Sequence, residues 1–187
     1  MRRAALLLLA IAAACRAPAQ GPYSPTAEDR PRDTVRAERL SKEAADLIHS
    51  NPSRAEELLR EALSADLFFG PAHNNLGVVY LGQDKLYEAA HEFEWARKLM
   101  PGHPDPRLNL AITLDRAGQE DEALAAYTAA LEVWPGHIGA IQGLASLSIR
   151  ARREEPRLEE WLERVALEGE SEAWREWARE WGARGER

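Results

Sequence analysis

Apolar and small residues recur at helical spacing through most of the chain from residue 36 onward. In two consecutive segments, 70–103 and 104–137, equivalent positions carry the same kinds of side chain, and no gap separates the segments. Apolar residues at i, i+3, i+4 and i+7 predict amphipathic α-helices. A unit of this length that repeats predicts pairs of helices stacked in a row, because each pair buries its apolar face only against its neighbours.

The equivalent positions of these two segments indicate how the helices of each pair pack. Small residues recur where two helices must approach closely, and large apolar residues recur between successive pairs. The small positions are Gly77, Ala89 and Ala96, then Ala111, Ala123 and Ala130. The large positions are Leu76, Tyr80 and Phe93, then Leu110, Leu114 and Tyr127. Pro101 and Pro135 are expected to end the second helices, and Gly118 to separate the two helices of its unit.

Two flanking segments, 36–69 and 138–168, continue the pattern less regularly. The first contains an apolar helical face made of Leu40, Ala44 and Leu47. Asn51 followed by Pro52 predicts the start of its second helix. The other flanking segment reads as a degenerate terminal repeat, with Ala140, Leu144 and Ala145 in its first helix. A second helix is expected to begin near Pro156, so the chain has about three and a half repeats.

A tryptophan-rich segment, 170–183, predicts one more helix, beginning after Ser171 and ending at Gly182. Its three indoles, Trp174, Trp177 and Trp181, stand at i, i+3 and i+7 and therefore share one face. Two interpretations are open. The helix either caps the apolar edge of the last repeat, which every stacked-repeat protein needs, or presents the indoles as a second interface.

The order of small and large positions, including Leu76-Gly77, Tyr80, Phe93 and Pro101, resembles the tetratricopeptide repeat. The usual aromatic residue of the fourth position is missing, because His73 and Arg107 stand there. The resemblance implies an all-α fold, a right-handed superhelical solenoid of antiparallel helix pairs closed by a C-terminal helix. It also implies a protein-binding function.

In tetratricopeptide proteins the first helices of the units line a concave groove that receives a peptide or a helix of a partner protein. Placed on this register, the groove residues are Asn74, Asn75, Val78, Leu108, Asn109, Ile112, Gln142 and Ser146. Asn75 and Asn109 match the recurrent asparagine of the family, which binds a peptide main chain or makes a contact inside the solenoid. The basic residues with which some members bind a free carboxylate are absent, since Asn74 and Val78 stand at those places.

The N-terminus has the pattern of a bacterial signal peptide. Arg2 and Arg3 precede an apolar run, 4–14, that is too short to cross a bilayer as a helix. Cys15 follows three alanines as in the lipobox of bacterial lipoproteins, which predicts residues 1–15 as the leader and Cys15 as the lipid attachment site. The alternative is ordinary cleavage after Ala19. The proline-rich segment that follows, up to residue 35, predicts a disordered linker.

The remaining composition argues against nucleic-acid binding and catalysis. The formal charge of −7 provides no basic surface for phosphates. His103 and His137 recur as a feature of the repeat, and no histidine pair has metal-ligand spacing with a third donor. No catalytic residue, metal site or cofactor is expected. Because a single cysteine forms no internal disulfide, apolar packing must hold the fold.

The sequence therefore predicts a non-enzymatic adaptor or assembly factor that binds a partner protein on the periplasmic side of the bacterial envelope. It contacts the membrane only through a lipid on Cys15, or is soluble if cleaved after Ala19. Self-association through the tryptophan face is the alternative function.

Overall fold

The computed structural model describes residues 31–185 of the chain. The expected signal peptide, Cys15, Ala19 and most of the expected linker lie outside this range, as do residues 186 and 187. The predictions for those residues stay predictions.

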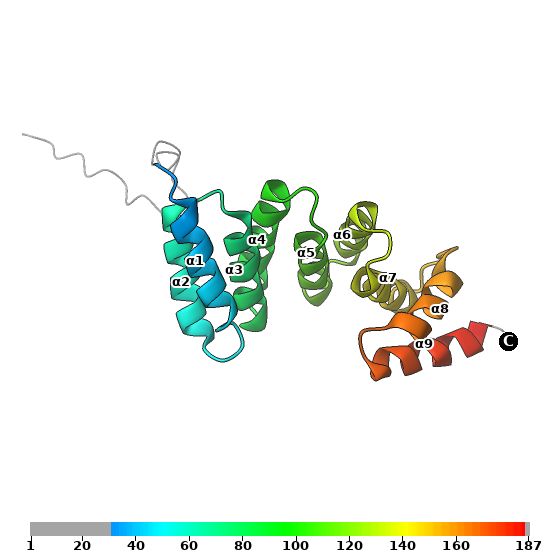
Figure 1. The fold of residues 1–187 in the computed structure, drawn as a ribbon. Coiled ribbons are helices and arrows are strands. Elements are labelled where there is room, and N and C mark those ends of the chain that lie inside the picture. The colour runs from blue at the N-terminus through cyan, green and yellow to red at the C-terminus, as the bar shows by residue number, and fades with distance from the viewer. Residues whose placement is uncertain (1–30, 186–187) are drawn as a thin grey trace, which may run out of the picture.

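The described part of the chain is all-α and contains no strand, as the sequence pattern predicts. Its helices are α1 (Thr34–Ala45), α2 (Pro52–Ala65), α3 (Gly70–Gly82), α4 (Leu86–Leu99), α5 (Asp105–Arg116), α6 (Glu120–Val133), α7 (Ile138–Arg150), α8 (Leu158–Glu168) and α9 (Glu172–Gly185). They follow one another along a single elongated row, from α1 at one end to α9 at the other (Figure 1).

Consecutive helices pair as α1 with α2, α3 with α4, and α5 with α6. The odd-numbered helices α1, α3, α5 and α7 also contact one another in turn, whereas no such series links the even-numbered helices. The odd-numbered helices therefore form one continuous layer of the solenoid, and the even-numbered helices lie against it. This arrangement is the predicted solenoid of helix pairs.

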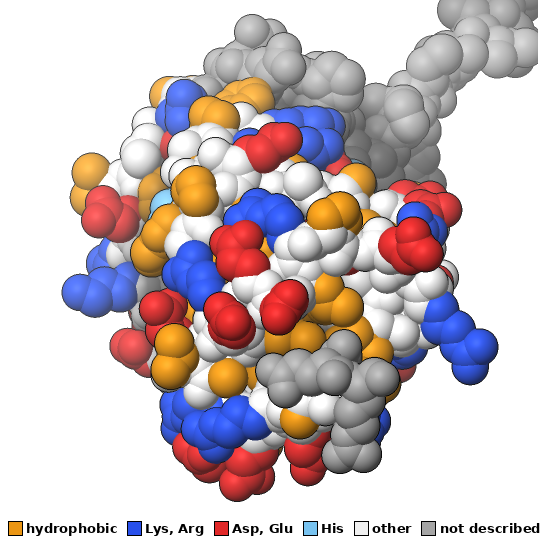
Figure 2. Space-filling view, turned by 90° about the vertical axis from the view of Figure 1, so that its right-hand side faces the viewer, with side chains coloured by type: hydrophobic (Ala, Val, Ile, Leu, Met, Phe, Trp, Pro, Cys, Tyr) orange, Lys and Arg blue, Asp and Glu red, His pale blue; other side chains and the backbone are white. Residues whose placement is uncertain are grey.

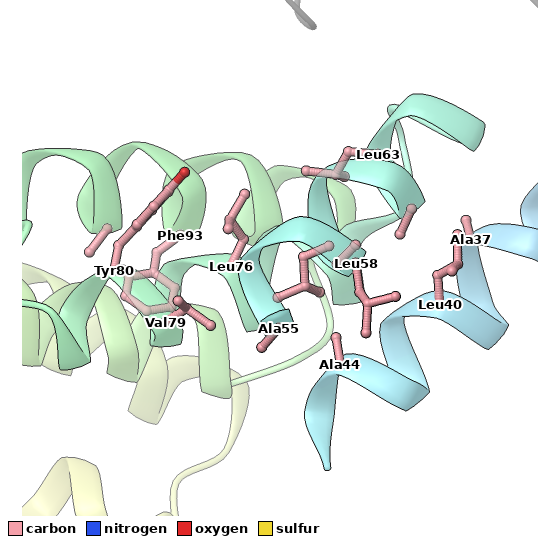
Figure 3. Packing of buried hydrophobic residues seen from close by; sticks show 14 of the residues in the cluster. Ala37, Leu40, Ala44, Ala55, Leu58, Leu63, Leu76, Val79, Tyr80 and Phe93 are labelled. Atoms are coloured by element: carbon pink, nitrogen blue, oxygen red, sulfur yellow. The ribbon is translucent and has the colours of Figure 1, made fainter. Parts of the chain in front are cut away.

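The core consists of two clusters of buried side chains that succeed each other along the row. The first joins α1 to α4 and includes Leu110 of α5, and Figure 3 shows Leu40, Leu58, Leu76 and Phe93 following one another along it. The second joins α5 to α9 and includes Tyr127. A core that continues from one repeat to the next explains how short helices are stable here, since each covers the apolar face of its neighbour.

The turns between the first and second helices of three repeats share one backbone geometry. Asp84, Gly118 and Arg152 each lie two residues after the end of an odd-numbered helix and have φ of 60°, 73° and 51°. In each turn the following N–H donates to a carbonyl five residues earlier, as from Gln119 to Leu114. This hydrogen bond closes the helix end in the way a left-handed residue permits. Gly118 thus ends α5 as predicted.

The first repeat departs from the regular spacing. Six residues, 46–51, connect α1 to α2, whereas three connect α3 to α4. The buried face of α1 consists of Ala37, Leu40, Ser41 and Ala44. These residues precede their α3 counterparts, such as Leu76 for Leu40, by 36 positions instead of 34. Leu47, which was expected on the helix face, lies in the turn after α1. Asn51 caps α2 as predicted, because its side chain accepts a hydrogen bond from the Arg54 N–H.

The last three helices also depart from the regular pattern. Seven residues, 151–157, connect α7 to α8, and α8 packs more extensively on α9 than on α7. The Ser171 hydroxyl accepts a hydrogen bond from the Trp174 N–H, as a capping residue does. The helix continues through Gly182 to Gly185, because Gly182 does not have the positive φ of a helix-ending glycine. Within residues 31–185 no helix is long and apolar enough to span a membrane.

Candidate functional site

The predicted groove lies along the layer of odd-numbered helices. Its residues Asn74, Asn75, Val78, Leu108, Asn109, Ile112 and Ser146 are partly exposed, and Gln142 is buried. All of them come from α3, α5 and α7, which follow one another in contact. The structure therefore brings these positions together on three consecutive helices. Only Gln142, at the C-terminal end, is not exposed.

Hydrogen bonds between side chains link the odd-numbered helices across this surface. The amide nitrogen of Asn75 donates to the Ser41 hydroxyl at 3.3 Å. The amide nitrogen of Asn109 donates to the amide oxygen of Asn74 at 3.1 Å. Each bond joins one repeat to the next. The recurrent asparagines thus have a structural contact, and within residues 31–185 their side-chain oxygens remain available as acceptors.

A strip of partly exposed apolar side chains accompanies these amides. Val78 on α3 packs against the first core cluster, while Leu108 and Ile112 on α5 pack against the second. Their inner surfaces are fixed by the core, so the strip keeps its shape without a partner. A fixed apolar strip next to hydrogen-bonding amides is suited to a peptide or helix that has apolar side chains and main-chain polar groups.

Two acidic residues, Asp105 and Asp115, border the strip, and each has a polar neighbour. Asp105 lies 3.5 Å from His103 Nδ1 and 3.7 Å from His137 Nε2, so one carboxylate stands between the two recurrent histidines. Asp115 forms an ion pair with Arg150 of the next repeat. The charge of Asp115 is therefore offset by an arginine of the next repeat.

The C-terminal end of the groove is closed by the chain itself. The Gln142 side-chain oxygen accepts a hydrogen bond from the Glu170 N–H at 2.8 Å, and its amide nitrogen donates to the Glu170 carboxylate at 3.2 Å. With only 3% of its surface exposed, Gln142 contacts the connection between α8 and α9 instead of solvent. The sequence gives no signal for this contact, because it depends on how the degenerate last repeat folds back.

A buried polar pair, His73 and Glu92, lies outside the groove. His73 Nε2 is 2.8 Å from the carbonyl oxygen of Leu67, which only accepts, so Nε2 carries a hydrogen. His73 Nδ1 is 2.7 Å from Glu92 Oε2, and a proton lies between these two atoms. The imidazole also stacks on Trp95 at 5.6 Å. Because His73 is fully buried, no substrate reaches it, and the pair holds α3 to α4.

Metal binding finds no support in the described range. Among residues 31–185 no group of three or more His, Cys, Asp or Glu side chains is placed to hold a metal ion.

The opposite face has a series of shallow hollows that the sequence did not indicate. They lie between successive even-numbered helices: α2 and α4, α4 and α6, and α6 and α8, with volumes of about 300, 400 and 390 Å³. Each has a floor supplied by the odd-numbered helix between them, such as Leu110 and Leu114 in the second. Since the hollows recur with the repeat, stacking alone accounts for them.

The three tryptophans of α9 lie against the second core cluster. Trp174 and Trp177 contact each other edge to face at 5.2 Å, and the Arg184 guanidinium covers Trp181 at 4.7 Å. All three indoles are partly buried. This packing favours the capping interpretation of the helix over a free second interface.

No protein-family model and no curated protein sequence matches the chain. Solved structures do match. The first tetratricopeptide domain of Spaghetti (RPAP3), bound to the HSP90 peptide SRMEEVD, is 17% identical with a TM-score of 0.62, covering 65% of this chain and 97% of that one. MamA is 21% identical with a TM-score of 0.61, covering 81% and 83%. The Sgt2 domain of Aspergillus fumigatus is 20% identical with a TM-score of 0.61, covering 66% and 85%.

These likenesses establish that the chain has the tetratricopeptide-repeat fold. At such low identity they establish the fold alone, so function is argued from the groove.

Proposed function

We propose that this protein is an interaction module that binds a segment of a partner protein along the groove of α3, α5 and α7. The observation that carries the proposal is the strip of Val78, Leu108 and Ile112, partly exposed on a layer whose helices are fixed to one another. Apolar side chains beside amide oxygens that accept no hydrogen bond within residues 31–185 suit a partner segment with both apolar side chains and main-chain donors. The peptide-bound RPAP3 domain shows that the same fold binds a peptide in another protein.

The groove favours a partner segment of low charge. The peptide bound to the RPAP3 domain, SRMEEVD, contains three acidic residues. Here Asn74 and Val78 stand where some members of this fold class have basic residues, and Arg150 is already in an ion pair with Asp115 on the border. An apolar stretch of a partner, extended or helical, therefore fits the strip better than an acidic terminus.

The proposed place of action is the extracytoplasmic side of a bacterial envelope, as an assembly or adaptor factor. The support is the pattern of residues 1–19 alone, with a lipid on Cys15 or cleavage after Ala19. The mass of the mature N-terminus tests this part by itself. A lipid-modified Cys15 or a free Gln20 supports export, and an unprocessed Met1 in the native host contradicts it.

The groove is tested by site-specific photo-crosslinking in the native host. A photoreactive residue at Val78 or Ile112 is expected to crosslink one defined partner. The same residue at Tyr87 on α4 or Leu167 on α8, which are 83% and 79% exposed and lie away from the groove, is the matched control. Equal crosslinking from all positions would contradict the proposal.

Substitution then tests whether the strip contributes to affinity. Leu108→Asp and Ile112→Asp are expected to abolish capture of the crosslinked partner, while Tyr87→Asp and Leu167→Asp preserve it. Because the strip residues pack partly against the core, circular dichroism must show unchanged helicity and thermal unfolding for each variant. Undiminished binding by folded strip variants would overturn the groove assignment.

A further inference from the structure

A hollow of about 630 Å³ lies at the C-terminal end of the solenoid. It is bounded by the end of α7, the connection to α8, α8 itself and the last turns of α9. Its lining consists of Ser148, Ile149, Arg152, Arg153, Glu155, Pro156, Leu158, Glu159, Leu162, Trp181, Gly182 and Arg184. It is larger than each hollow between the even-numbered helices, and Figure 2 faces this end of the molecule, where apolar and charged side chains intermingle.

The sequence of the last repeat explains why this space is open. Ser148 stands at the repeat position that Leu114 occupies in α5 and Tyr80 in α3. A serine fills much less volume than either of them. Helix α9 does not fill the space left by the missing large side chain, because it packs mainly on α8 and not on α7. The hollow is therefore specific to this repeat, whereas the hollows of the opposite face recur.

Some polar side chains that line the hollow have a hydrogen-bond or ion-pair partner in the described range, and others have none. The Ser148 side chain is 2% exposed and has no hydrogen-bond partner among residues 31–185. Arg152 is exposed and has no ion-pair partner in the same range, whereas Arg153 pairs with Asp121. Arg184 lies over the Trp181 ring with its charge not neutralised by a described carboxylate. Two guanidinium groups without a described carboxylate partner thus line the hollow together with its apolar residues.

We propose that this hollow binds an amphiphilic monocarboxylate, a fatty acid of medium chain length. The aliphatic chain lies on Leu158, Leu162 and Trp181, and the carboxylate pairs with Arg152 and Arg184. Arginine is suited to this task because its planar guanidinium binds a carboxylate through two parallel hydrogen bonds. The volume of about 630 Å³ lies within the range of roughly 300–1,000 Å³ that is typical of small-molecule sites, and the lining combines apolar residues such as Leu158 and Leu162 with five charged side chains.

The other charges of the rim restrict the ligand further. Glu155 and Glu159 also line the hollow and repel a ligand with several negative charges, such as a polyphosphate. A peptide terminus is disfavoured as well, because its main-chain groups need hydrogen-bond partners. Apart from Ser148, the lining side chains between the charged groups are apolar. One negative charge on a hydrocarbon chain fits both the rim and the floor.

Gly182 allows the hollow to be filled without disturbing the fold. It lines the hollow, and a Cβ added there meets no atom within 4 Å. Gly182→Leu therefore places a side chain into the space that the ligand needs, and it raises helix propensity. Gly82→Leu is the matched control, since Gly82 is also in a helix with nothing within 4 Å of its added Cβ but lies at the end of α3.

The test is isothermal titration calorimetry of the purified full chain with decanoate, below the concentration at which decanoate forms micelles. One saturable site is expected, bound about tenfold more tightly than decanol, which lacks the charge. Arg152→Gln and Arg184→Gln are each expected to weaken decanoate binding about tenfold, with decanol unaffected. Gly182→Leu is expected to lose the site, and Gly82→Leu to retain it.

Three results would overturn the proposal. The first is equal affinity for decanoate and decanol, which would remove the role of the arginines. The second is undiminished binding by Gly182→Leu, which would place the site elsewhere. The third is tighter binding of a short peptide ending in a free leucine carboxylate than of decanoate, which would exclude the fatty acid as the ligand class.

Discussion

The Cα atom of Gly77 lies directly against the ring of Phe93. A Cβ added to Gly77 would come within 2.6 Å of Phe93 Cε1, closer than carbon atoms approach in folded proteins. Phe93 is fully buried, and its ring cannot move aside in a close-packed core. The pair fixes how closely α3 and α4 approach each other, and with it the position of Asn74 and Val78 on the groove side of α3.

Gly77→Ala is therefore expected to destabilise the fold by about 1–3 kcal/mol, as overpacking does in a dense core. Gly82→Ala in the same helix is expected to stabilise it by about 0.5–1 kcal/mol, because its added Cβ meets no atom within 4 Å. Urea unfolding followed by circular dichroism measures both. Equal effects of the two substitutions would show that the Phe93 contact does not control the helix spacing.

The turn residues with positive φ predict opposite effects on stability for two substitutions, one that removes a glycine and one that introduces a glycine. Gly118 has φ of 73° with nothing near its added Cβ, so Gly118→Ala strains only the backbone. We expect a loss of about 1 kcal/mol. Arg152 has the same kind of backbone without being glycine, so Arg152→Gly is expected to gain a similar amount. Urea unfolding in the absence of fatty acid measures both variants, so that no ligand affects Arg152→Gly. A lower stability of Arg152→Gly would contradict the role of the positive φ.

The buried pair of His73 and Glu92 predicts a non-additive pair of substitutions. His73→Phe removes the 2.7 Å hydrogen bond from a carboxyl group that is 4% exposed, at an expected cost of about 2–4 kcal/mol. The double variant His73→Phe/Glu92→Leu removes both polar groups and is expected to recover most of this loss. A double-mutant cycle by urea unfolding measures the coupling. Additive losses would mean that the two side chains act independently.

The Asp66 carboxylate predicts sensitivity to acid. Burial alone would raise the pKa of Asp66, but hydrogen bonds from Arg32 at 2.8 Å, from Thr34 at 2.8 Å and from the Phe68 N–H outweigh it, so the pKa is lowered. A carboxyl group with a lowered pKa in the folded state stabilises the fold above its unfolded pKa, near 3.8. This contribution disappears as the pH falls through the lower folded value.

Asp66→Asn is therefore expected to be less stable than the wild type at neutral pH, and the difference is expected to shrink below pH 3.8. Thermal unfolding across an acid series measures this convergence. Asp121→Asn serves as the control, because Asp121 is an exposed carboxylate on α6 whose side chain is 77% exposed. Curves that stay parallel down to the lowest pH would show that Asp66 is not the responsible group.

The regular repeats could be predicted from the sequence because their contacts are local in the repeat register. Gly77, Phe93 and Ala96 are buried at the positions that the 34-residue spacing indicates. A helical pattern shows which face is apolar, so it located the pairs α3–α4 and α5–α6. The assignment of Val78, Leu108 and Ile112 to the groove came instead from the resemblance to the tetratricopeptide repeat, and it stays a prediction.

The features that the sequence did not reveal depend on contacts outside this register. Glu92 looks like a solvent-facing acid on α4, and only the fold shows that it meets His73 in the core. Ser41 is buried at the place that Gly77 holds in α3, because the buried face of α1 is displaced by two residues from the 34-residue spacing. Glu170 closes the groove through Gln142, and no periodicity indicates an acid in a turn as the partner of a glutamine.

The last prediction concerns α9, whose tryptophans cover the second core cluster. In a solenoid each repeat contacts mainly its neighbours, so removal of an end element is expected to destabilise the nearest repeats most. A chain truncated after Gly169 loses Trp174, Trp177 and the contact of Glu170 with Gln142. We expect amide hydrogens of α7 and α8 to exchange at least tenfold faster, about 1.4 kcal/mol, while those of α3 change little. Sedimentation of the same variant separates the two interpretations of the tryptophan face. If α9 is a capping helix, the wild type is a monomer and the truncated chain associates through its uncovered apolar end. If α9 mediates self-association, the wild type associates and the truncated chain is a monomer. A uniform loss of protection from α1 to α8 would instead mean that the solenoid unfolds as one cooperative unit.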